Sequence, residues 1–513
     1  MRWPNATRDA TWPRVDRPHL INPTGADTGA VASSAIAPAA ERPRDVAPPA
    51  TSSWTANLIP LAVASALFME FIDSTALSTA LPSLARAFNS DPVHLKLALT
   101  SYLLALAVCA PASGWVADRY GARRVFICAM AVFLGGSALC GFSHSLPQLV
   151  GSRIIQGLGG AMMTPVGRLI VVGSAPRDRF VTAMSWFTMP AMVGPLLGPP
   201  LAGLVLGVAS WPWIFFINIP VGILGMIAVA RFVPKLQNDH PGRFDSPGFF
   251  LSALSITGIV FLSETAGVGL VSLPVLLAAL VTAVIASVLF LRHVRRRERP
   301  VLELDLLKVD TFCASNVGGT LVRLGLGATP LLLPLLLQIG LGWSPVKAGL
   351  VTISQSFGAL MFKPVAPAVI RRVGYKNVLV FSAVATGVTV AIPAAFNAST
   401  PLIAMVVLLG LSGFIRSMHF TSSNALAYAD IPKTKVSQAS TLSTVLQQVS
   451  MSLGVSFGGL MLHLARGHDG ALTPEHFVMP FLVVGFTSLL AAPVYMRLRA
   501  DAGAEIGGRA TAH

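Results

Sequence analysis

From residue 57 onward, long apolar runs follow one another with only short polar segments between them. A helix of about 20 residues crosses a hydrocarbon core of roughly 30 Å, and these runs have about that length. The pattern predicts an all-α chain with fourteen membrane-spanning helices. They fall near residues 57–80, 95–117, 124–142, 148–173, 181–207, 213–232, 248–266, 272–292, 312–340, 345–370, 376–396, 401–427, 438–464 and 477–497.

The overall composition agrees with a membrane protein. The chain is 53% hydrophobic and 12% charged, with a mean hydropathy of +0.68. Ordinary globular domains carry about 25% charged residues, so this chain uses lipid as its solvent. The net charge of +15 could point to a nucleic-acid partner. The basic residues, however, form short clusters between apolar runs rather than a patch interleaved with aromatic residues, and a nucleic-acid partner is not expected.

The distribution of Lys and Arg orients the spans. If the N-terminus is cytoplasmic, most Lys and Arg residues between spans fall on the cytoplasmic side, as the positive-inside rule requires. An even number of spans then makes the C-terminus cytoplasmic as well. The outer side receives only Arg86, Lys96, Lys347 and Arg466.

The apolar runs and the segments between them predict five parts. Residues 1–54 are rich in Pro, Ala, Arg and Ser and lack a signal-peptide core, so we expect a disordered cytoplasmic tail; an incorrectly chosen start codon is the alternative. We further expect an N-terminal six-helix bundle over 55–232, two inserted helices and a linker over 233–300, a C-terminal six-helix bundle over 301–500 and a cytoplasmic tail over 501–513.

A short internal repeat supports this division. The segments DRYGARR (118–124) and RRVGYKN (371–377) align on Gly121 and Gly374, and each has a basic residue two positions before and two positions after its glycine. Duplicated halves with a site at the membrane midplane are typical of secondary transporters. A chance match is the alternative.

Two glycine-containing motifs carry further information. In GWVADRYGARRV, Gly114 suits close backbone approach, Gly121 suits a tight turn with positive φ, and Asp118 suits a cap or an ion pair. A simple basic loop would explain Arg119, Arg123 and Arg124, but not the Asp and the two Gly. In GPLLGPPLAG, three glycines form a small face and three prolines bend the helix, although a packing kink is the alternative. These residues are Gly194, Pro195, Gly198, Pro199, Pro200 and Gly203.

Together with two further segments, these motifs resemble those of the major facilitator superfamily, in its fourteen-helix drug:proton antiporter branch. RIIQGLGGAMMTPVGRLIV resembles the fourth-helix motif of that family, with Arg153, Gln156 and Gly157 in the expected places, and WPWIFFINIPVG resembles the entry to the sixth helix. The resemblance covers about residues 55–497. It implies a bacterial inner-membrane antiporter driven by the proton gradient without a cofactor. It also implies that the Asp118 loop stabilises one conformation and that the GPLLGPPLAG helix seals the pathway against leak. Ala202 departs slightly from the fifth-helix pattern.

Glu70 and Asp73 lie in the middle of the first predicted span, where charges are costly and therefore mark function. They are three residues apart on one helix face, and two close carboxylates do not both ionise easily, so we expect one to load and release protons. Asp73 occupies the position of an aspartate in the family motif, and we expect it to carry or gate the proton. Glu70 is an additional acid that is expected to tune Asp73. The alternative is a structural ion pair with Arg153 or Arg168. A third acid, Glu264, is expected near the outer surface.

Basic and polar residues in other spans predict where substrate binds. We expect Arg168 and Arg323 to face a central cavity together, with Arg416 and Lys363 nearby, which would favour an anionic or zwitterionic substrate. Pairing with the acids, or snorkelling to the membrane surface, is the alternative. Trp186, His419 and Asn424 are further candidates for the cavity wall; packing and interhelical hydrogen bonds are the alternative roles.

The sequence contains no P-loop, zinc-ligand spacing or nucleophile elbow, and its four cysteines lie singly within apolar runs, so no enzyme, metal or cofactor is expected. We expect a monomer that exports small organic compounds in exchange for protons, with other envelope efflux components as candidate partners. An exporter of an anionic metabolite or carboxylate chelate is one alternative. A membrane sensor or scaffold that binds a ligand without moving it is another.

Overall fold

The computed structural model describes residues 55–174, 180–234, 243–265, 271–297, 300–432, 435–467 and 472–503. The predicted tail 1–54 and most of the predicted tail 501–513 lie outside the described residues. The described residues fold into helices joined by short turns, which confirms the all-α prediction.

The helices follow the predicted spans closely. The first six spans become α1 (Thr55–Ala87), α2 (Lys96–Cys109) with α3 (Ser113–Tyr120), α4 (Ala122–Gly141), α5 (Leu146–Ser174), α6 (Phe180–Val208), and α7 (Trp213–Phe216) with α8 (Asn218–Phe232). The next two become α9 (Ser246–Thr265) and α10 (Leu273–Arg296). The last six become α11 (Asp310–Leu335), α12 (Pro345–Phe362) with α13 (Ala366–Val373), α14 (Tyr375–Ala391), α15 (Leu402–Ala427), α16 (Val436–Arg466), and α17 (Val478–Leu489) with α18 (Ala492–Met496).

Four predicted spans are split into two helices, and two of these breaks illustrate the effect of proline. Between α2 and α3, Pro111 lies in a short 3-10 turn, Ala110–Ala112. In the predicted span 345–370, α12 ends at Phe362, and Pro364 lies in the turn that precedes α13. Proline has no backbone N–H and crowds the preceding turn, so a straight helix does not continue through it easily.

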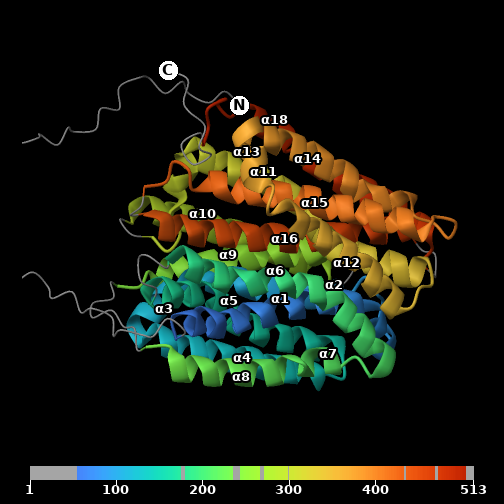
Figure 1. Cartoon of the computed structure of the whole chain (residues 1–513), viewed down its shortest axis with the longest axis horizontal. Coiled ribbons are helices and arrows are strands. Elements are labelled where there is room, and N and C mark those ends of the chain that lie inside the picture. Colours follow the sequence, from blue (N-terminus) through green and yellow to red (C-terminus); the bar gives the residue numbers. More distant parts are fainter. Residues whose placement is uncertain are drawn as a thin grey trace, which may run out of the picture. The chain divides into compact units, whose positions relative to one another are not determined.

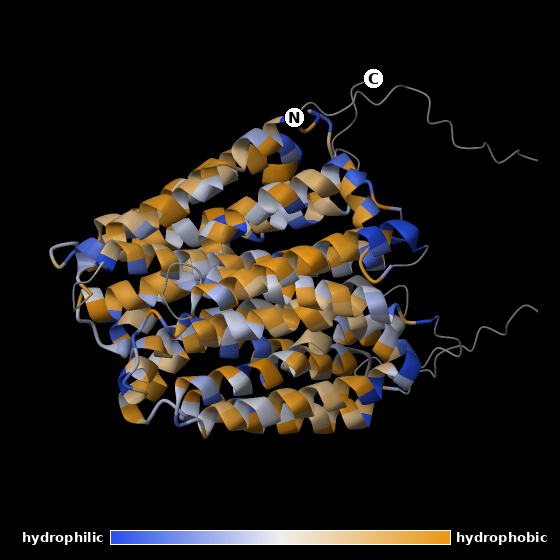
Figure 2. Ribbon diagram, turned by 180° about the vertical axis from the view of Figure 1, so that it is seen from behind, coloured by the Kyte–Doolittle hydropathy of each residue, from blue (hydrophilic) through white to orange (hydrophobic). Residues whose placement is uncertain are grey.

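Twelve helices in the described residues are long and apolar enough to cross a membrane, and the chain is a multi-pass membrane protein. Figure 2 shows hydrophobic residues along the helices and many of the hydrophilic ones near their ends. Two predicted spans lie outside this set. They are α6, in which Val193–Val208 forms a shorter apolar helix, and α12. The count of fourteen and the cytoplasmic side of the termini therefore stay predictions.

Helix contacts join neighbours within the first six spans and within the last six. Helix α1 packs on α6 and α8, and α4 on α5; in the later part, α11 packs on α16 and α17, and α12 on α15. The most extensive contacts between the two sets are those of α6 with α12, α2 with α16 and α1 with α11. Figure 1 shows α9 beside α16, and α4 beside α8. The boundaries of the five predicted parts stay a prediction.

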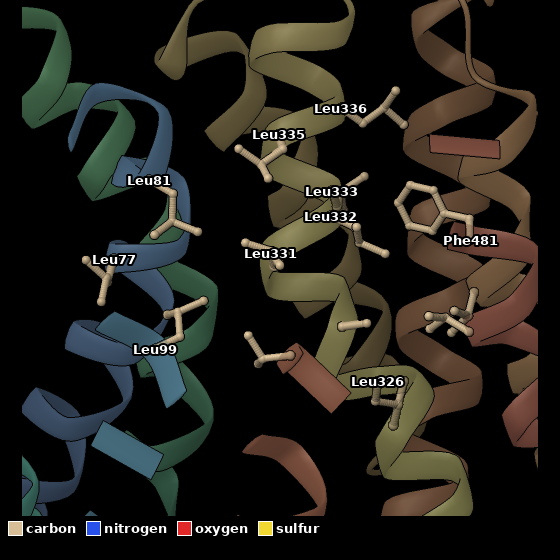
Figure 3. Packing of buried hydrophobic residues seen from close by; sticks show 14 of the residues in the cluster. Leu77, Leu81, Leu99, Leu326, Leu331, Leu332, Leu333, Leu335, Leu336 and Phe481 are labelled. Atoms are coloured by element: carbon tan, nitrogen blue, oxygen red, sulfur yellow. The ribbon is translucent and has the colours of Figure 1, made fainter. Parts of the chain in front are cut away.

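Helix α11 lies deepest among these helices and α10 lies outermost. In the apolar window of α11, 78% of the residues are buried, compared with 17% in α10, which identifies α10 as a lipid-facing helix. Figure 3 shows Leu331 and Leu335 of α11 pointing toward α1 and α2, and Leu332 pointing toward Phe481 of α17. One apolar cluster therefore continues from the first set of helices into the last.

The turns of the internal repeat have the same backbone conformation. Gly121 ends α3 and begins α4 with φ 87° and ψ 125°, and Gly374 ends α13 and begins α14 with φ 86° and ψ 154°. L-residues with a side chain rarely adopt such angles. The predicted positive φ of Gly121 is confirmed, and the aligned glycine shares it.

Candidate functional site: a central cavity and its buried polar network

A cavity of about 600 Å³ lies between the first six spans and the last six. Helices α1, α2, α5 and α6 line it on one side, and α11, α12, α15 and α16 on the other. Most of the lining is apolar, with hydroxyl and amide groups interspersed. Its charged residues are Glu70, Arg153, Lys363 and Arg416. A largely apolar cavity with a few fixed polar groups is the usual form of a small-molecule site.

Asp73 lies outside this cavity lining, in a buried network behind it. The side chain of Arg153 is fully buried, and its Nη1 lies 2.5 Å from Asp73 Oδ2. Gln156 Nε2 and Asn218 Nδ2 donate to Asp73 Oδ1 at 2.8 Å and 3.0 Å. The ionised carboxylate is thus balanced by one cation and two further donors, the arrangement that allows a charge to remain in a low-dielectric interior.

Helix α5 positions this network through the predicted fourth-helix motif. Arg153 and Gln156 are three residues apart and share a face, and Arg153 Nη1 also donates to Gln156 Oε1 at 2.6 Å. A Cβ atom on Gly157 would lie 2.6 Å from Ala105 Cβ, so only glycine lets α5 approach α2 here. The alternative predicted for the acids, a structural ion pair with Arg153, is therefore realised at Asp73.

Arg153 also borders the cavity. Its guanidinium lies 4.3 Å from the centre of the Tyr102 ring, and its Nε donates to Ala98 O at 3.1 Å. Among the described residues, Arg153 Nη2 and the Tyr102 hydroxyl are buried without a hydrogen-bond partner. Buried donors without acceptors are costly. These two groups can therefore donate hydrogen bonds to a carboxylate that approaches from the cavity side.

Glu70 is the acid that lines the cavity. It lies one turn before Asp73 on α1, and Thr164 Oγ1 donates to its Oε2 at 3.0 Å. No ion pair to Glu70 is present in the described part of the chain. The two acids that the sequence placed together thus have different surroundings, since Asp73 is held by three side chains and Glu70 by one hydroxyl.

The predicted basic residues do not gather at one point. Arg416 lines the cavity from α15, with no hydrogen-bond or ion-pair partner in the part of the chain that the structure describes. Lys363 also lines it and donates to Thr421 Oγ1 at 3.2 Å. Arg168 instead donates to Ser440 Oγ at 2.9 Å, and neither it nor Arg323 is among the cavity-lining residues. The expectation that Arg168 and Arg323 face a common cavity differs from the structure, because Arg168 bonds to α16 and Arg323 bonds to a backbone carbonyl of its own helix, α11.

Arg323 belongs to a second buried cluster. It is 3% exposed, and its Nη2 donates to Asn316 O at 3.3 Å. His419 lies between Ser382 Oγ, 3.1 Å from Nδ1, and the Tyr495 hydroxyl, 3.3 Å from Nε2. His419, predicted for the cavity wall, is therefore held in this cluster. Asn424 accepts a hydrogen bond from Gln447, which does line the cavity, and Trp186 is exposed on α6 outside it.

The predicted glycine face of α6 makes close contacts in two directions. A Cβ on Gly194 would lie 2.7 Å from Phe71 Cβ of α1, and one on Gly203 would lie 2.8 Å from Pro345 O of α12. Gly198 faces Thr75 of α1. The expectation that these glycines allow close helix approach is confirmed.

One proline of the same segment joins α6 to α12. Pro199 has no N–H to give to the carbonyl of Pro195, four residues earlier, and Ser356 of α12 donates to that carbonyl at 2.8 Å instead. A Cβ on Gly349 of α12 would lie 2.5 Å from Pro199 O. The first set of helices therefore meets the last set along a tight contact at this bent segment.

The predicted gate loop is partly as expected. Arg123 donates to Ala230 O at the end of α8, which fixes the start of α4, whereas Arg119 and Arg124 are exposed. The Asp118 side chain is not isolated, since it interacts with other groups of the protein. The expectation for Gly114 is wrong in this structure: nothing lies within 4 Å of a Cβ placed there, because this residue faces outward from α3.

Lys96 and Glu264 form a buried ion pair that the sequence did not predict. Both lie at helix ends, Lys96 at the start of α2 and Glu264 in the last turn of α9, and the expectation that they lie near the outer surface stays a prediction. Lys96 is fully buried, Glu264 is 4% exposed, and Lys96 Nζ lies 3.2 Å from Glu264 Oε2. Hydropathy places charges at the ends of spans in water. Here the two ends pack against a third helix, and the charges pair instead of reaching the surface.

Sequence reasoning also missed several neutral members of the network. Asn218 and Ser137 bond to each other at 3.0 Å, and Ser137 Oγ donates to Phe215 O at 2.9 Å. Tyr102 stacks on Arg153. The available signal was a single amide in the apolar run FFINIPVG, which costs free energy in a membrane unless it is bonded.

Comparison with known proteins agrees with this architecture. The family model described as Major Facilitator Superfamily matches residues 63–303 and 316–511. The protein named "Putative multidrug resistance protein MdtD" of Escherichia coli (strain SMS-3-5 / SECEC) is 38% identical over 449 residues, covering 86% of this chain and 94% of that protein. The protein of the same name from Shigella flexneri gives the same values.

Two solved structures share the fold. A D-xylose-proton symporter aligns with a TM-score of 0.62 at 16% identity over 88% of this chain and 99% of its own. A POT family transporter in complex with 5-aminolevulinic acid aligns with a TM-score of 0.65 at 14% identity, over 86% and 94%. Taken with the family match and the 38% identity to the relatives, the chain belongs to the major facilitator superfamily of membrane transporters.

Proposed function

We propose that this transporter exports small organic compounds across the bacterial inner membrane in exchange for protons, by alternating exposure of the central cavity. The observation that carries the proposal is the position of Glu70, a carboxyl group on the cavity wall whose only hydrogen-bond partner among the described residues is Thr164. The relatives named as multidrug resistance proteins support the substrate class. The proton gradient supplies the energy, and no cofactor takes part.

Glu70 carries the proton in this proposal. A carboxyl group that lines a cavity can take a proton from one side of the membrane and release it on the other when the cavity changes access. When Glu70 loses its proton, the free Nη2 of Arg153 and the Tyr102 hydroxyl on the same wall can bind its carboxylate. Substrate and proton then compete for one cavity, which produces antiport.

Asp73 serves as the fixed counter-charge of Arg153. It is already bound by Arg153, Gln156 and Asn218, and protonating it would break the ion pair with Arg153. The proposal therefore reverses the roles expected from the sequence, in which Asp73 carries the proton and Glu70 tunes it. Here Glu70 exchanges protons, and Asp73 holds Arg153 in place.

The test uses purified protein in proteoliposomes with an imposed pH gradient and ethidium as a cationic dye. Glu70→Gln is expected to lower the rate of proton-driven ethidium uptake by more than about tenfold, while ethidium exchange without a pH gradient is retained. Glu475→Gln, an exposed acid in the short 3-10 helix Pro474–Phe477, is the matched control. Proton-driven uptake that survives Glu70→Gln would refute this role for Glu70.

A second candidate is export of an organic anion, favoured by Arg416 on the cavity wall without a partner among the described residues. Carboxyfluorescein in the same vesicles tests it. If Arg416→Gln abolishes carboxyfluorescein transport and leaves ethidium transport intact, the cavity recognises anions through Arg416. If ligands bind but neither dye nor protons move, the protein is a sensor and the transport proposal fails. Involvement of other envelope components and a monomeric state stay proposals.

A further inference from the structure

A buried ion pair connects three helices that are far apart in the sequence. Lys96 begins α2, Glu264 lies in the last turn of α9, and Ser456 lies in the second half of α16. Lys96 Nζ lies 3.2 Å from Glu264 Oε2 and also donates to the Glu264 backbone carbonyl at 3.2 Å. Ser456 Oγ donates to Glu264 Oε1 at 2.5 Å. Glu264 thus receives a cation from α2 and a hydroxyl from α16.

The packing of α16 provides room for this pair. The Lys96 side chain passes Gly459, and a Cβ there would lie 2.6 Å from Lys96 Cδ. Lys96 is fully buried, so it does not extend to the membrane surface as lysines near helix ends usually do. The site therefore depends on a glycine in α16, an acid in α9 and a lysine in α2.

Helix α9 lies where the first six spans meet the last six. It packs against both α2 and α16, and α2 and α16 also pack on each other. Its partner α10 packs mainly on α9 and is largely exposed to lipid. The α9–α10 pair is therefore anchored through α9.

The two contacts of Glu264 differ in strength. Separating Lys96 from Glu264 would leave a cation and an anion unpaired in an apolar interior, which is strongly unfavourable. Separating Ser456 from Glu264 loses one hydrogen bond to a charged group, a smaller loss. A second ion pair near this seam, Asp91 with Arg466, is partly exposed and can be solvated by water when it opens.

We propose that the Lys96–Glu264 pair fastens the α9–α10 helices to α2, so that they move with the first six spans when α2 and α16 separate. The Ser456–Glu264 hydrogen bond is the contact that opens. The inserted helices are thus a moving part of the N-terminal set. This inference rests on the alternating access proposed above.

Spin-label distances in the full-length protein test the proposal. Labels on a background in which Cys109, Cys128, Cys140 and Cys313 are replaced would occupy the exposed positions Ala87 (α1), Val275 (α10) and Leu464 (α16). Distances are compared at pH 5 and pH 8, with and without ethidium. We expect the 87–275 distance to stay narrow, while 275–464 and 87–464 change together.

Two variants make the experiment decisive. Lys96→Met with Glu264→Gln removes both charges, so no buried charge is left alone, and it should broaden the 87–275 distance. Ser456→Ala keeps the ion pair and should leave 87–275 narrow while raising the population with a long 275–464 distance by about tenfold.

The outcomes separate this inference from the proposed function. A constant 275–464 distance with a changing 87–275 distance would show that α9–α10 move with the last six spans, which overturns the inference but not alternating access. A narrow 87–275 distance in the double variant would also overturn it. A constant 87–464 distance under all conditions would refute the proposed alternating access, and the inference with it.

Discussion

The two buried polar clusters occupy corresponding helices in the first and last sets of six spans, but their charges differ. In the first set, the cluster joins Asp73, Ser137, Arg153 and Asn218, on the first, third, fourth and sixth spans. In the last set, Arg323, Ser382, His419 and Tyr495 come from the same four places in order. The first cluster holds an acid and a base. The second holds a base with no acid among the described residues.

This difference shows how a duplicated fold divides its roles. The first cluster is a closed ion pair, with donors for each carboxylate oxygen, that places Arg153 beside the cavity. The second cluster packs a buried guanidinium next to Gly319, where a Cβ would lie 2.7 Å from Arg323 Nη1. Coupling chemistry is therefore expected on the first side, and mainly structural packing on the second.

The largest effect is expected from removing the acid of the first cluster. Asp73→Leu leaves Arg153, which cannot lose its proton, unpaired and buried, and should cost about 3–5 kcal/mol of stability. Arg153→Met should cost less, because Asp73 can then take a proton while Gln156 and Asn218 still bond to it. Thermal unfolding of the purified variants in detergent would measure the order.

The double variant Asp73→Leu with Arg153→Met is the control for this prediction. It removes both charges and should recover most of the stability while transport stays lost. Equal losses of stability from the two single variants would argue that the two side chains stabilise the protein by their packing rather than by their charges.

Hydropathy alone predicted the spans well. Breaks at Pro111 and Pro364 were the main deviations, since a run of apolar residues does not reveal where a helix bends. The pairing of Asp73 with Arg153 was foreseen as an alternative. The pairing of Lys96 with Glu264 was not predicted, because their burial depends on three helices meeting in space, which the order of residues does not specify.

The site was predicted less completely for the same reason. Arg416 lines the cavity as expected, but Arg168 bonds to α16 and Arg323 bonds to a carbonyl of its own helix. A residue's span can be read from the sequence, whereas the direction of its side chain depends on helix rotation. That rotation is set by packing against neighbours, as at Gly157 and Gly203.

An intermediate effect is expected at the two repeated turns around Gly121 and Gly374. These turns have similar backbone angles in the two halves, whereas the two clusters differ in charge. Gly121→Ala and Gly374→Ala each force a side chain into a backbone region that is nearly restricted to glycine, at a cost of about 1–3 kcal/mol. Gly114→Ala is the matched control, because a Cβ there meets nothing and alanine favours a helix. Midpoints of thermal unfolding would be compared, and a large difference between Gly121→Ala and Gly374→Ala would argue against equivalent turns.

The smallest effect is expected at the base of the second cluster, and it tests the comparison most directly. Arg323→Met removes a buried cation that has no acid partner in the described part of the chain and only one hydrogen bond, to Asn316 O. The lost hydrogen bond is worth about 1 kcal/mol, but methionine also removes the cost of burying a charged guanidinium. The free energy of unfolding should therefore stay the same or rise. Arg153→Met is its counterpart in the first cluster and should lower the midpoint of thermal unfolding. If Arg323→Met destabilises the protein as much as Arg153→Met does, an anion from outside the described residues must neutralise Arg323. The two clusters would then be alike in charge.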